Sequence, residues 1–310
     1  MEKLLIVGGS GFIGRNLAEW GHKEGIDVTI LSKTGSVDKE FLPDVKVIKV
    51  DLLDDENLRE SLKGKRFDFV VNLSGYIDHS DFFSGGELVL KVHFLGLVNL
   101  LSCIERDNLK SFINIGSSDE YGNQRAPQKE TMRESPISPY SSAKVASTHL
   151  LQNLHRTEGF PATILRLFLV YGIGQKKDRF IPQIIDGCLS RNSFMTSEGK
   201  QLRDFTYVDD ISRGIIMALR NKKALGEVIN LASGEAISIH SLINLIKNKI
   251  GYGDPDFGAI PYRSSENMEL VANSEKARKM LNWKPIIGIE EGLDLVIEDY
   301  LLRSIEQPKS

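Results

Sequence analysis

Residues 8–14 read Gly8-Gly9-Ser10-Gly11-Phe12-Ile13-Gly14 and directly follow the apolar run at residues 4–7. The run predicts a buried strand, the glycines predict a tight turn, and the apolar residues that follow at helical spacing predict a helix. Such a turn directs backbone N–H groups and the positive end of a helix towards an anion, usually a dinucleotide pyrophosphate. We therefore predict a dinucleotide-binding turn, whose cofactor-binding residues are Gly8, Gly11, Phe12, Ile13 and Gly14.

Strand and helix signals alternate over the first half of the chain. Short apolar segments predict strands at 3–7, 27–31, 45–50, 67–73, 111–115 and 162–167, with helices at about 12–24, 55–62, 86–106 and 140–157. Strands with few polar residues are typical of a parallel sheet that is covered on both faces. The alternation predicts an α/β fold, a Rossmann-type doubly wound parallel sheet with ligands at the carboxyl ends of the strands.

The alternation breaks after about residue 170, where turn-rich pieces separate short helices. We interpret residues 1–170 as a dinucleotide-binding domain to which 203–231 return. Residues 171–202 and 232–310 mainly form a smaller, discontinuous α/β substrate-binding lobe. The substrate is expected in the cleft between the two.

Composition excludes several classes of function. The chain has 310 residues, 41% hydrophobic and 26% charged, and a net charge of −3, which gives no basic bias towards nucleic acid. No segment approaches the roughly 20 apolar residues of a membrane span. Two cysteines, Cys103 and Cys188, provide no disulfide framework, and six histidines show no metal-ligand spacing. We expect a cytoplasmic protein with neither metal, membrane nor nucleic-acid partner.

The end of the second predicted strand bears on the choice of cofactor. NAD-binding folds usually place an acid there to hold the ribose 2′-hydroxyl, whereas this chain reads Ser32-Lys33-Thr34. Hydroxyls and an ammonium suit a 2′-phosphate, so NADP(H) is favoured and NAD(H) stays open. Asp51 and Leu52 either flank the adenine or form a surface turn, and Leu73 ends the fourth strand beside the cofactor.

Tyr140 and Lys144 share one face of a predicted helix, because they are four residues apart. A phenol titrates near pH 10, so it works as an acid–base at neutrality only where its anion is stabilised, for example by a nearby ammonium. The pair follows a strand that ends in Gly116-Ser117-Ser118-Asp119-Glu120-Tyr121-Gly122, where a serine can donate a hydrogen bond to the same substrate oxygen.

The chain resembles extended short-chain dehydrogenases/reductases, in the branch of nucleotide-sugar epimerases, dehydratases and 4-ketoreductases. The motifs that carry the resemblance are residues 8–14, the serine-rich strand end, Tyr140 with Lys144, Arg166 followed by Val170-Tyr171-Gly172, Arg203-Asp204-Phe205-Thr206-Tyr207-Val208-Asp209-Asp210, Asn230-Leu231 with Gly234, and Leu281-Asn282-Trp283-Lys284-Pro285.

The resemblance assigns catalytic roles. Tyr140 would be the acid–base, Lys144 would hold the nicotinamide ribose, and Ser118 would polarise the sugar C4 oxygen. Ser117 is the alternative to Ser118, because the segment before Tyr121 is one residue shorter than the common family form. Together with Asp119, Glu120 would either serve an elimination, as in 4,6-dehydratases, or cap the local backbone.

The resemblance also suggests substrate contacts. Arg203 and Arg263 would grip a diphosphate through bidentate guanidinium forks. Arg179 would line the nucleotide pocket, and His79 would face the sugar. His93 stands where family members often carry Asn, and it either hydrogen-bonds the backbone or water or packs in its helix.

We therefore predict an NAD(P)-dependent oxidoreductase acting at C4 of a nucleoside-diphosphate sugar. A 4-keto-sugar reductase or 4-dehydrogenase is the favoured form, and a 4-epimerase or 4,6-dehydratase is the alternative. A non-catalytic dinucleotide-sensing scaffold is a remote third possibility. By resemblance, the chain would serve cell-surface polysaccharide biosynthesis as a homodimer that pairs the helices at 86–106 and 140–157.

Overall fold

The computed structural model describes residues 1–35, 45–262 and 266–306. Its main sheet is parallel throughout, in the order β11-β6-β5-β4-β1-β2-β3. The strands are β1 (Lys3–Val7), β2 (Asp27–Ser32), β3 (Lys46–Lys49), β4 (Phe69–Asn72), β5 (Ser111–Ser117), β6 (Ala162–Leu167) and β11 (Val228–Leu231). The predicted doubly wound α/β fold is confirmed.

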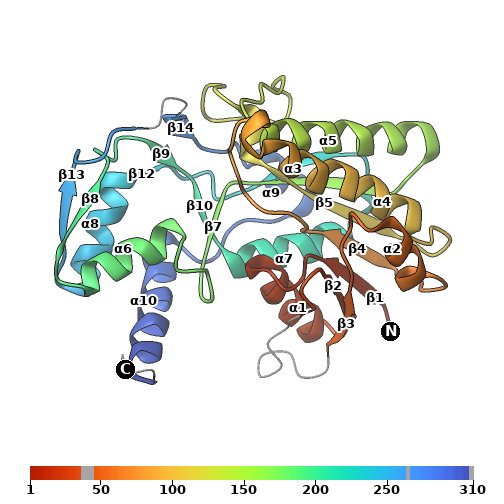
Figure 1. Cartoon of the computed structure of the whole chain (residues 1–310), viewed down its shortest axis with the longest axis horizontal. Coiled ribbons are helices and arrows are strands. Elements are labelled where there is room, and N and C mark those ends of the chain that lie inside the picture. Colours follow the sequence, from red (N-terminus) through yellow and green to blue (C-terminus); the bar gives the residue numbers. More distant parts are fainter. Residues whose placement is uncertain (36–44, 263–265, 307–310) are drawn as a thin grey trace.

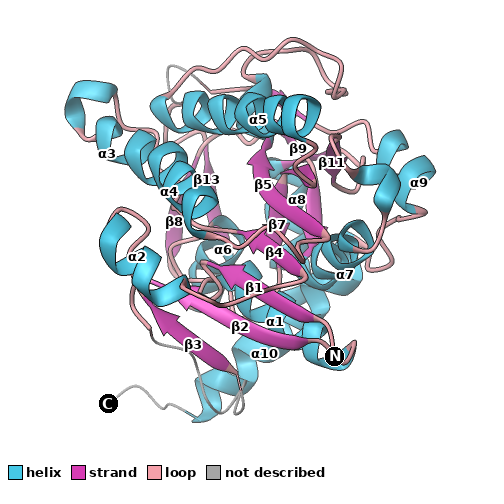
Figure 2. Ribbon diagram, turned by 90° about the vertical axis from the view of Figure 1, so that its right-hand side faces the viewer, coloured by secondary structure: helices cyan, strands magenta, loops and turns pink. Residues whose placement is uncertain are grey.

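Two layers of helices cover the sheet, as Figures 1 and 2 show. One layer comprises α1 (Phe12–Lys23), α7 (Val208–Leu219) and α9 (Glu275–Leu281); the other comprises α2 (Asp55–Leu62), α3 (Gly86–Leu90), α4 (Gly96–Cys103) and α5 (Pro139–Glu158). Successive side chains of a strand point to opposite faces. Leu4 and Ile6 accordingly join the core under α1 and α7, while Leu5 and Val7 join the core under α2, α4 and α5.

The remaining elements form a smaller lobe, on the left of Figure 1. Its apolar core lies between α6 (Phe180–Leu189), α8 (Ile239–Ile250) and α10 (Ile289–Glu306). Three small sheets complete it and join it to the main lobe: β8 (Ser193–Thr196) with β13 (Asp254–Phe257), β7 (Leu169–Tyr171) with β10 (Phe205–Tyr207), and β9 (Leu202–Arg203) between β12 (Ile237–Ser238) and β14 (Glu269–Leu270). The division of the chain into two domains stays our proposal; α9, from the C-terminal part, packs on the main sheet.

Buried acids of the Arg203–Asp210 motif fasten chain segments together. Asp204 is fully buried and accepts hydrogen bonds from three backbone N–H groups, those of Ser233, Gly234 and Ala272, at 2.9–3.1 Å. Asp210 accepts the N–H groups of Ile286 and Ile287 at 2.8 and 2.9 Å. Since burying a carboxylate is costly unless it is hydrogen-bonded, these contacts explain acids in the interior and fix the chain after α9.

The predicted helix at 86–106 is interrupted and ends earlier. It consists of α3, a π-helical turn, η2 (Lys91–Leu95), and α4, which ends at Cys103. Residues 86–103 have a mean hydropathy of 1.4 and one third of this stretch is buried, so by length and composition it reaches the threshold of a membrane span, contrary to our expectation. In this structure it packs on α5 and α2.

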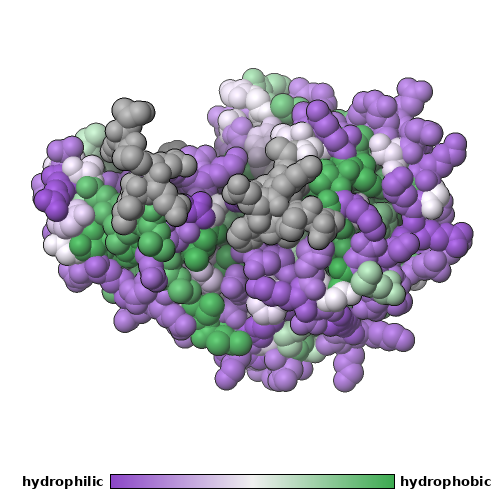
Figure 3. Space-filling view, turned by 90° about the horizontal axis from the view of Figure 1, so that it is seen from below, coloured by the Kyte–Doolittle hydropathy of each residue, from purple (hydrophilic) through white to green (hydrophobic). Residues whose placement is uncertain are grey.

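On the face seen in Figure 3, hydrophilic side chains surround separate apolar patches.

Candidate active site

The glycine turn joins β1 to α1 at the carboxyl edge of the sheet. Gly8 has a φ of +78°, and a Cβ there would come within 2.9 Å of the Leu73 backbone, which follows β4. A Cβ on Gly14 would lie 2.5 Å from the Gly9 Cα. The N-cap of α1 is Gly11, which offers the first N–H groups of the helix no side-chain oxygen. The turn is therefore a close-packed backbone cradle that fits a pyrophosphate.

Two predicted cofactor residues meet beside this turn. The Lys33 ammonium lies 2.8 Å from the Asp51 carboxylate, on an exposed surface. Partial burial of Asp51 acts to raise its pKa, but the hydrogen bond and charge of Lys33 and a backbone N–H lower it overall. Ser32 hydrogen-bonds Ser10 of the turn at 2.7 Å, and Leu52 is buried in the second core. In this structure the Lys33 ammonium is thus paired with the Asp51 carboxylate.

Two of the predicted catalytic residues, Tyr140 and Lys144, lie in the first turns of α5. Ser138 caps this helix, accepting a hydrogen bond from the Ser141 N–H at 3.1 Å, and Pro139 occupies its first position, which favours a helix start here. Tyr140 and Lys144 are both buried. The Lys144 ammonium donates to the Ile115 carbonyl of β5 at 2.7 Å and lies 5.7 Å from the centre of the Tyr140 ring.

Burial dominates the ionisation of both groups. It raises the pKa of the Tyr140 phenol well above its ordinary value, and the Asp119 carboxylate raises it further, while a hydrogen bond with Ser117 opposes the shift. Burial lowers the pKa of Lys144 to about 8, although Glu120 and Asp119 act in the opposite direction. The phenol therefore holds its proton at neutral pH in the protein alone and can donate it to an oxygen anion.

Ser117 and Ser118 differ in their surroundings. Ser117 ends β5, and its hydroxyl accepts a hydrogen bond from the Asp119 N–H at 3.1 Å in the short turn η3 (Ser118–Tyr121). The Ser117 hydroxyl acts to lower the pKa of Tyr140, so it lies close to the phenol. Both serines are buried, but Ser118 is not among the groups that shift the pKa of Tyr140. Ser117 is therefore the better candidate to share a substrate oxygen with Tyr140.

Glu120 is fully buried in an ion pair. One carboxylate oxygen accepts the Ser117 N–H at 2.9 Å, and the other accepts the Thr148 hydroxyl at 2.8 Å and two N–H groups of Arg166 at 2.8 and 3.0 Å. Of the two roles considered from the sequence, the structure favours the cap, extended by an ion pair. Both oxygens hold protein groups, which leaves Glu120 badly placed to remove a substrate proton.

His79 and Asp119 flank Tyr140 on its loop side. The His79 ring meets the Tyr140 ring edge-on, with centroids 5.6 Å apart, and its Nε2 lies 3.7 Å from an Asp119 carboxylate oxygen. Burial raises the pKa of Asp119, opposed by the charges of His79 and Arg203. His93 packs edge-on against Tyr140 as well, at 5.0 Å. No sequence pattern predicts the contact of His93 with Tyr140 or the pairing of Asp119 with His79, because both depend on side-chain packing.

The predicted substrate arginines have different environments. Arg203 is buried, donates to the Leu202 carbonyl at 2.8 Å and forms an ion pair with Glu266, which the sequence analysis did not single out. Arg179 lies at the start of α6, and its charge acts to lower the pKa of Tyr140. Both guanidinium groups therefore border the site. Arg263 lies outside the described residues.

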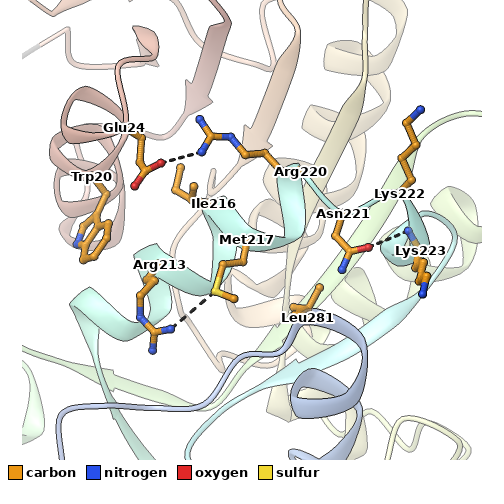
Figure 4. Close-up of a pocket in the computed structure, with 10 residues that line it drawn as sticks. All are labelled: Trp20, Glu24, Arg213, Ile216, Met217, Arg220, Asn221, Lys222, Lys223 and Leu281. Carbon is orange, nitrogen blue, oxygen red and sulfur yellow. Dashed lines mark hydrogen bonds and ion pairs between the residues drawn. The ribbon is translucent and has the colours of Figure 1, made fainter.

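A separate hollow of about 570 Å³ lies between the C-terminal ends of α1 and α7 (Figure 4). Trp20, Ile216, Met217 and Leu281 supply its apolar lining, and Arg220 spans it to Glu24 at 2.7 Å. Arg220 also approaches Glu2, which precedes β1, whereas the glycine turn follows β1. The hollow is thus at the opposite edge of the sheet from Tyr140, and no predicted site residue lines it.

Comparison with known proteins places this geometry in context. The model of the "NAD dependent epimerase/dehydratase family" matches residues 4–232. The chain is 28% identical to a UDP-glucuronate 4-epimerase of Thermodesulfobacterium geofontis, over 100% of this chain and 99% of that protein. It is similar to the structure of Thermotoga maritima UDP-glucose 4-epimerase with UDP-glucose: TM-score 0.89, 25% identity, 98% and 100% coverage. Thermus thermophilus UDP-glucose 4-epimerase, solved with NAD, shares the fold: TM-score 0.86, 23% identity, 96% and 99% coverage.

Proposed function

Because the chain belongs to the NAD dependent epimerase/dehydratase family, we propose that it is a nucleoside-diphosphate-sugar 4-epimerase. The observation that carries the proposal is the cluster of Tyr140, Lys144 and Ser117 at the carboxyl edge of the sheet, beside a glycine turn that fits a pyrophosphate. The relatives named above are 4-epimerases of UDP-sugars, which favours a UDP-sugar as substrate. The sequence favours a 4-keto-sugar reductase or 4-dehydrogenase, whereas the relatives support the epimerase alternative better.

The proposed chemistry divides between the protein and its cofactor. When bound, NAD supplies the hydride acceptor and donor for C4, and residues 8–14 and Lys144 would hold it. The pKa of the Tyr140 phenol would be lowered by the positive charge of the oxidised nicotinamide, so that Tyr140 as the phenolate removes the proton of the C4 hydroxyl during oxidation and returns it to the oxygen during reduction. Ser117 donates a hydrogen bond to the same oxygen. Arg203 and Arg179 bind the diphosphate, which keeps the nucleotide fixed while the oxidised sugar rotates to present its other face to the cofactor.

The environment of Glu120 disfavours a 4,6-dehydratase. An elimination needs a base for the C5 proton and an acid for the departing hydroxyl. Asp119 borders Tyr140 and is available for proton transfer, but both oxygens of Glu120 hold protein groups. With only one carboxylate available, we expect the site to carry out oxidation and reduction at C4 without the elimination.

A 4-keto-sugar reductase is the second candidate, and the end of β2 favours it. No acid occupies Ser32-Lys33-Thr34, and the exposed Lys33 ammonium suits a 2′-phosphate of NADP(H) once it turns from Asp51. A reductase would exchange its cofactor freely, whereas an epimerase recycles one bound nucleotide. NADP(H) use stays a prediction of the sequence.

The test begins with the nucleotide that copurifies with the protein, released and identified by mass spectrometry. The protein is then incubated with UDP-glucose and with UDP-glucuronate, and the C4 epimers are separated by chromatography. Epimer formation without net change in absorbance at 340 nm supports an epimerase. Consumption of NADPH with a 4-keto sugar nucleotide, and no epimer from either UDP-sugar, would replace it by the reductase. Tyr140→Phe is the inactive control.

We also propose that the protein forms a homodimer through α3, α4 and α5. Leu88 and Leu95 are 52% and 44% exposed on the apolar stretch at residues 86–103, and a second copy of the chain would cover them. Sedimentation velocity at micromolar concentration should give a dimer, and Leu88→Glu with Leu95→Glu should give a monomer. A wild-type monomer would contradict the proposal.

A further inference from the structure

His93 lies at the point where the helix at 86–103 changes to a π-helical turn, η2. Turns of this kind are frequent at functional sites. The side chain is only 6% exposed, and its Nε2 lies 2.8 Å from the Tyr76 carbonyl in the loop that follows β4. The Ser147 hydroxyl of α5 donates to the His93 carbonyl at 3.5 Å. One residue thus joins the β4 loop, the π turn and the catalytic helix.

The ring of His93 also touches Tyr140. The two ring centroids are 5.0 Å apart and the rings are inclined by 82°, which is the edge-to-face arrangement that aromatic pairs prefer. His79 contacts the same phenol ring at 5.6 Å and 78°. Two imidazoles therefore border the Tyr140 ring, and His93 is the buried one. This packing restricts the rotation of the phenol at its β-carbon and fixes where its hydroxyl points.

The hydrogen bond of His93 fixes its tautomer. A carbonyl oxygen can only accept, so Nε2 carries the proton that bonds Tyr76. Burial and, to a smaller extent, the nearby Lys144 charge lower the pKa of His93 to about 3, so Nδ1 has no proton at neutral pH. The Tyr76 carbonyl is a neutral acceptor that acts in the opposite direction. His93 is therefore a neutral, uncharged wedge beside a pair whose charges matter.

Gly75 makes room for this wedge. Its φ is +106°, and a Cβ there would lie 2.1 Å from the His93 Cε1. Any other residue would push the imidazole or the β4 loop away. The loop carries His79, so its position and the position of His93 are set together.

We propose that His93 is a positioning residue for Tyr140: its ring holds the phenol edge-on, and its Nε2–H ties the β4 loop to the catalytic helix. The inference rests on the proposed role of Tyr140 as the acid–base. The proposed role requires no contact of His93 with substrate or cofactor, because the residue acts through the orientation of the phenol and the exclusion of water from it.

Two substitutions separate the parts of this role. His93→Phe keeps a ring beside Tyr140 and loses the hydrogen bond; His93→Asn keeps a donor and loses the ring. Edge-to-face pairs are worth enough to predict about a 3- to 10-fold fall in kcat for His93→Asn, with KM for the sugar nucleotide within about twofold of wild type. His93→Ala, which loses both, should fall by about 100-fold.

The pH profile adds a readout that a purely structural role would not move. Burial is the first cause of the raised pKa of Tyr140. Water entering the space left by His93→Asn would relieve this burial and lower the pKa of the phenol; because Tyr140 acts first as a base, the acidic limb of kcat should move to lower pH. His93→Phe should leave that limb in place. A wild-type kcat and an unchanged acidic limb in both His93→Asn and His93→Ala would overturn the proposal.

His155→Ala is the matched control, because His155 also bonds a backbone carbonyl, that of Phe160 at 2.9 Å, at the far end of α5. It should leave kcat unchanged. Tyr140→Phe in the same assay keeps the two claims apart. An active Tyr140→Phe enzyme would contradict the proposed function. An inactive Tyr140→Phe enzyme, together with His93 variants whose kcat equals that of wild type, would contradict only the role of His93.

A measurement on the wild-type protein does not depend on whether variants fold. Nitrogen-15 NMR of the histidine side chains should show His93 neutral, with its proton on Nε2, from pH 5.5 to 8.5. A His93 that titrates in this range, or that carries its proton on Nδ1, would contradict the contact with Tyr76 and with it the proposal.

Discussion

Replacing Glu120 tests whether this carboxylate is a structural anchor or a catalytic base. Its side chain and that of Arg166 are both fully buried and paired at 2.8 Å, and Glu134 is the second partner of Arg166 at 2.7 Å. In Glu120→Gln the shape is nearly kept, but Arg166 loses one of its two carboxylates, and the amide cannot accept all the hydrogen bonds that the carboxylate accepts.

The expected loss of stability is large. Breaking a buried ion pair by removing one partner costs about 3–5 kcal/mol, because a buried charge is left incompletely paired. Because the contact of Arg166 with Glu134 remains, Glu120→Gln should lose about 3 kcal/mol of stability, and Glu120→Ala should lose about 5 kcal/mol. Urea denaturation followed by circular dichroism measures the difference as a shift of the midpoint at constant slope.

The control and the refutation are both accessible. Glu158, paired with Arg106 at 3.3 Å and half-exposed, should lose at most about 1 kcal/mol as Glu158→Gln. If the free energy of unfolding of Glu120→Gln lies within about 1 kcal/mol of wild type while kcat falls more than 100-fold, Glu120 is a catalytic base and our reasoning from its contacts is wrong.

Three further predictions concern the site. Tyr140→Phe should lower kcat by about 10²- to 10⁴-fold with little change in KM, as initial rates would show, and an enzyme of near wild-type rate would remove Tyr140 from the mechanism. Lys33→Ala should lower kcat/KM for NADP(H) at least tenfold relative to NAD(H), measured with both nucleotides, and an unchanged ratio would mean that Lys33 serves only Asp51. The free energy of unfolding should rise between about pH 8 and pH 10, because folded Lys144, with its pKa lowered to about 8, releases its proton before the unfolded chain does. Lys144→Met should flatten that rise; an identical curve would contradict the burial of the ammonium.

Local patterns were sufficient for the framework of the main lobe. β1, α1, α2 and β6 begin or end within a residue of the predicted ranges, because each is a strongly patterned segment bounded by turn residues. The predicted helix at 86–106 failed at its middle and its end, since the π turn brings His93 beside Gly75 and Tyr140, a tertiary arrangement that no local pattern specifies. The strands of two to four residues after β6 were not predicted, because so few residues carry too little periodicity; they include β11 of the main sheet and β7, β8, β9, β10, β12, β13 and β14.

The sequence by itself predicted six strands of the main sheet and the glycine turn, because spacing along the chain records which residues share a face or a turn, and its motifs carried the resemblance to the family. It also brought Tyr140 and Lys144 onto one helix. Only the tertiary structure decided the partners of the charged groups: Glu120 with Arg166, Lys33 with Asp51, and Arg203 with Glu266. These pairs join residues 18 to 63 positions apart. No local pattern specifies such contacts, because they form only when separate elements of the chain pack together, and for Glu120 with Arg166 the packing also withdraws both charges from water.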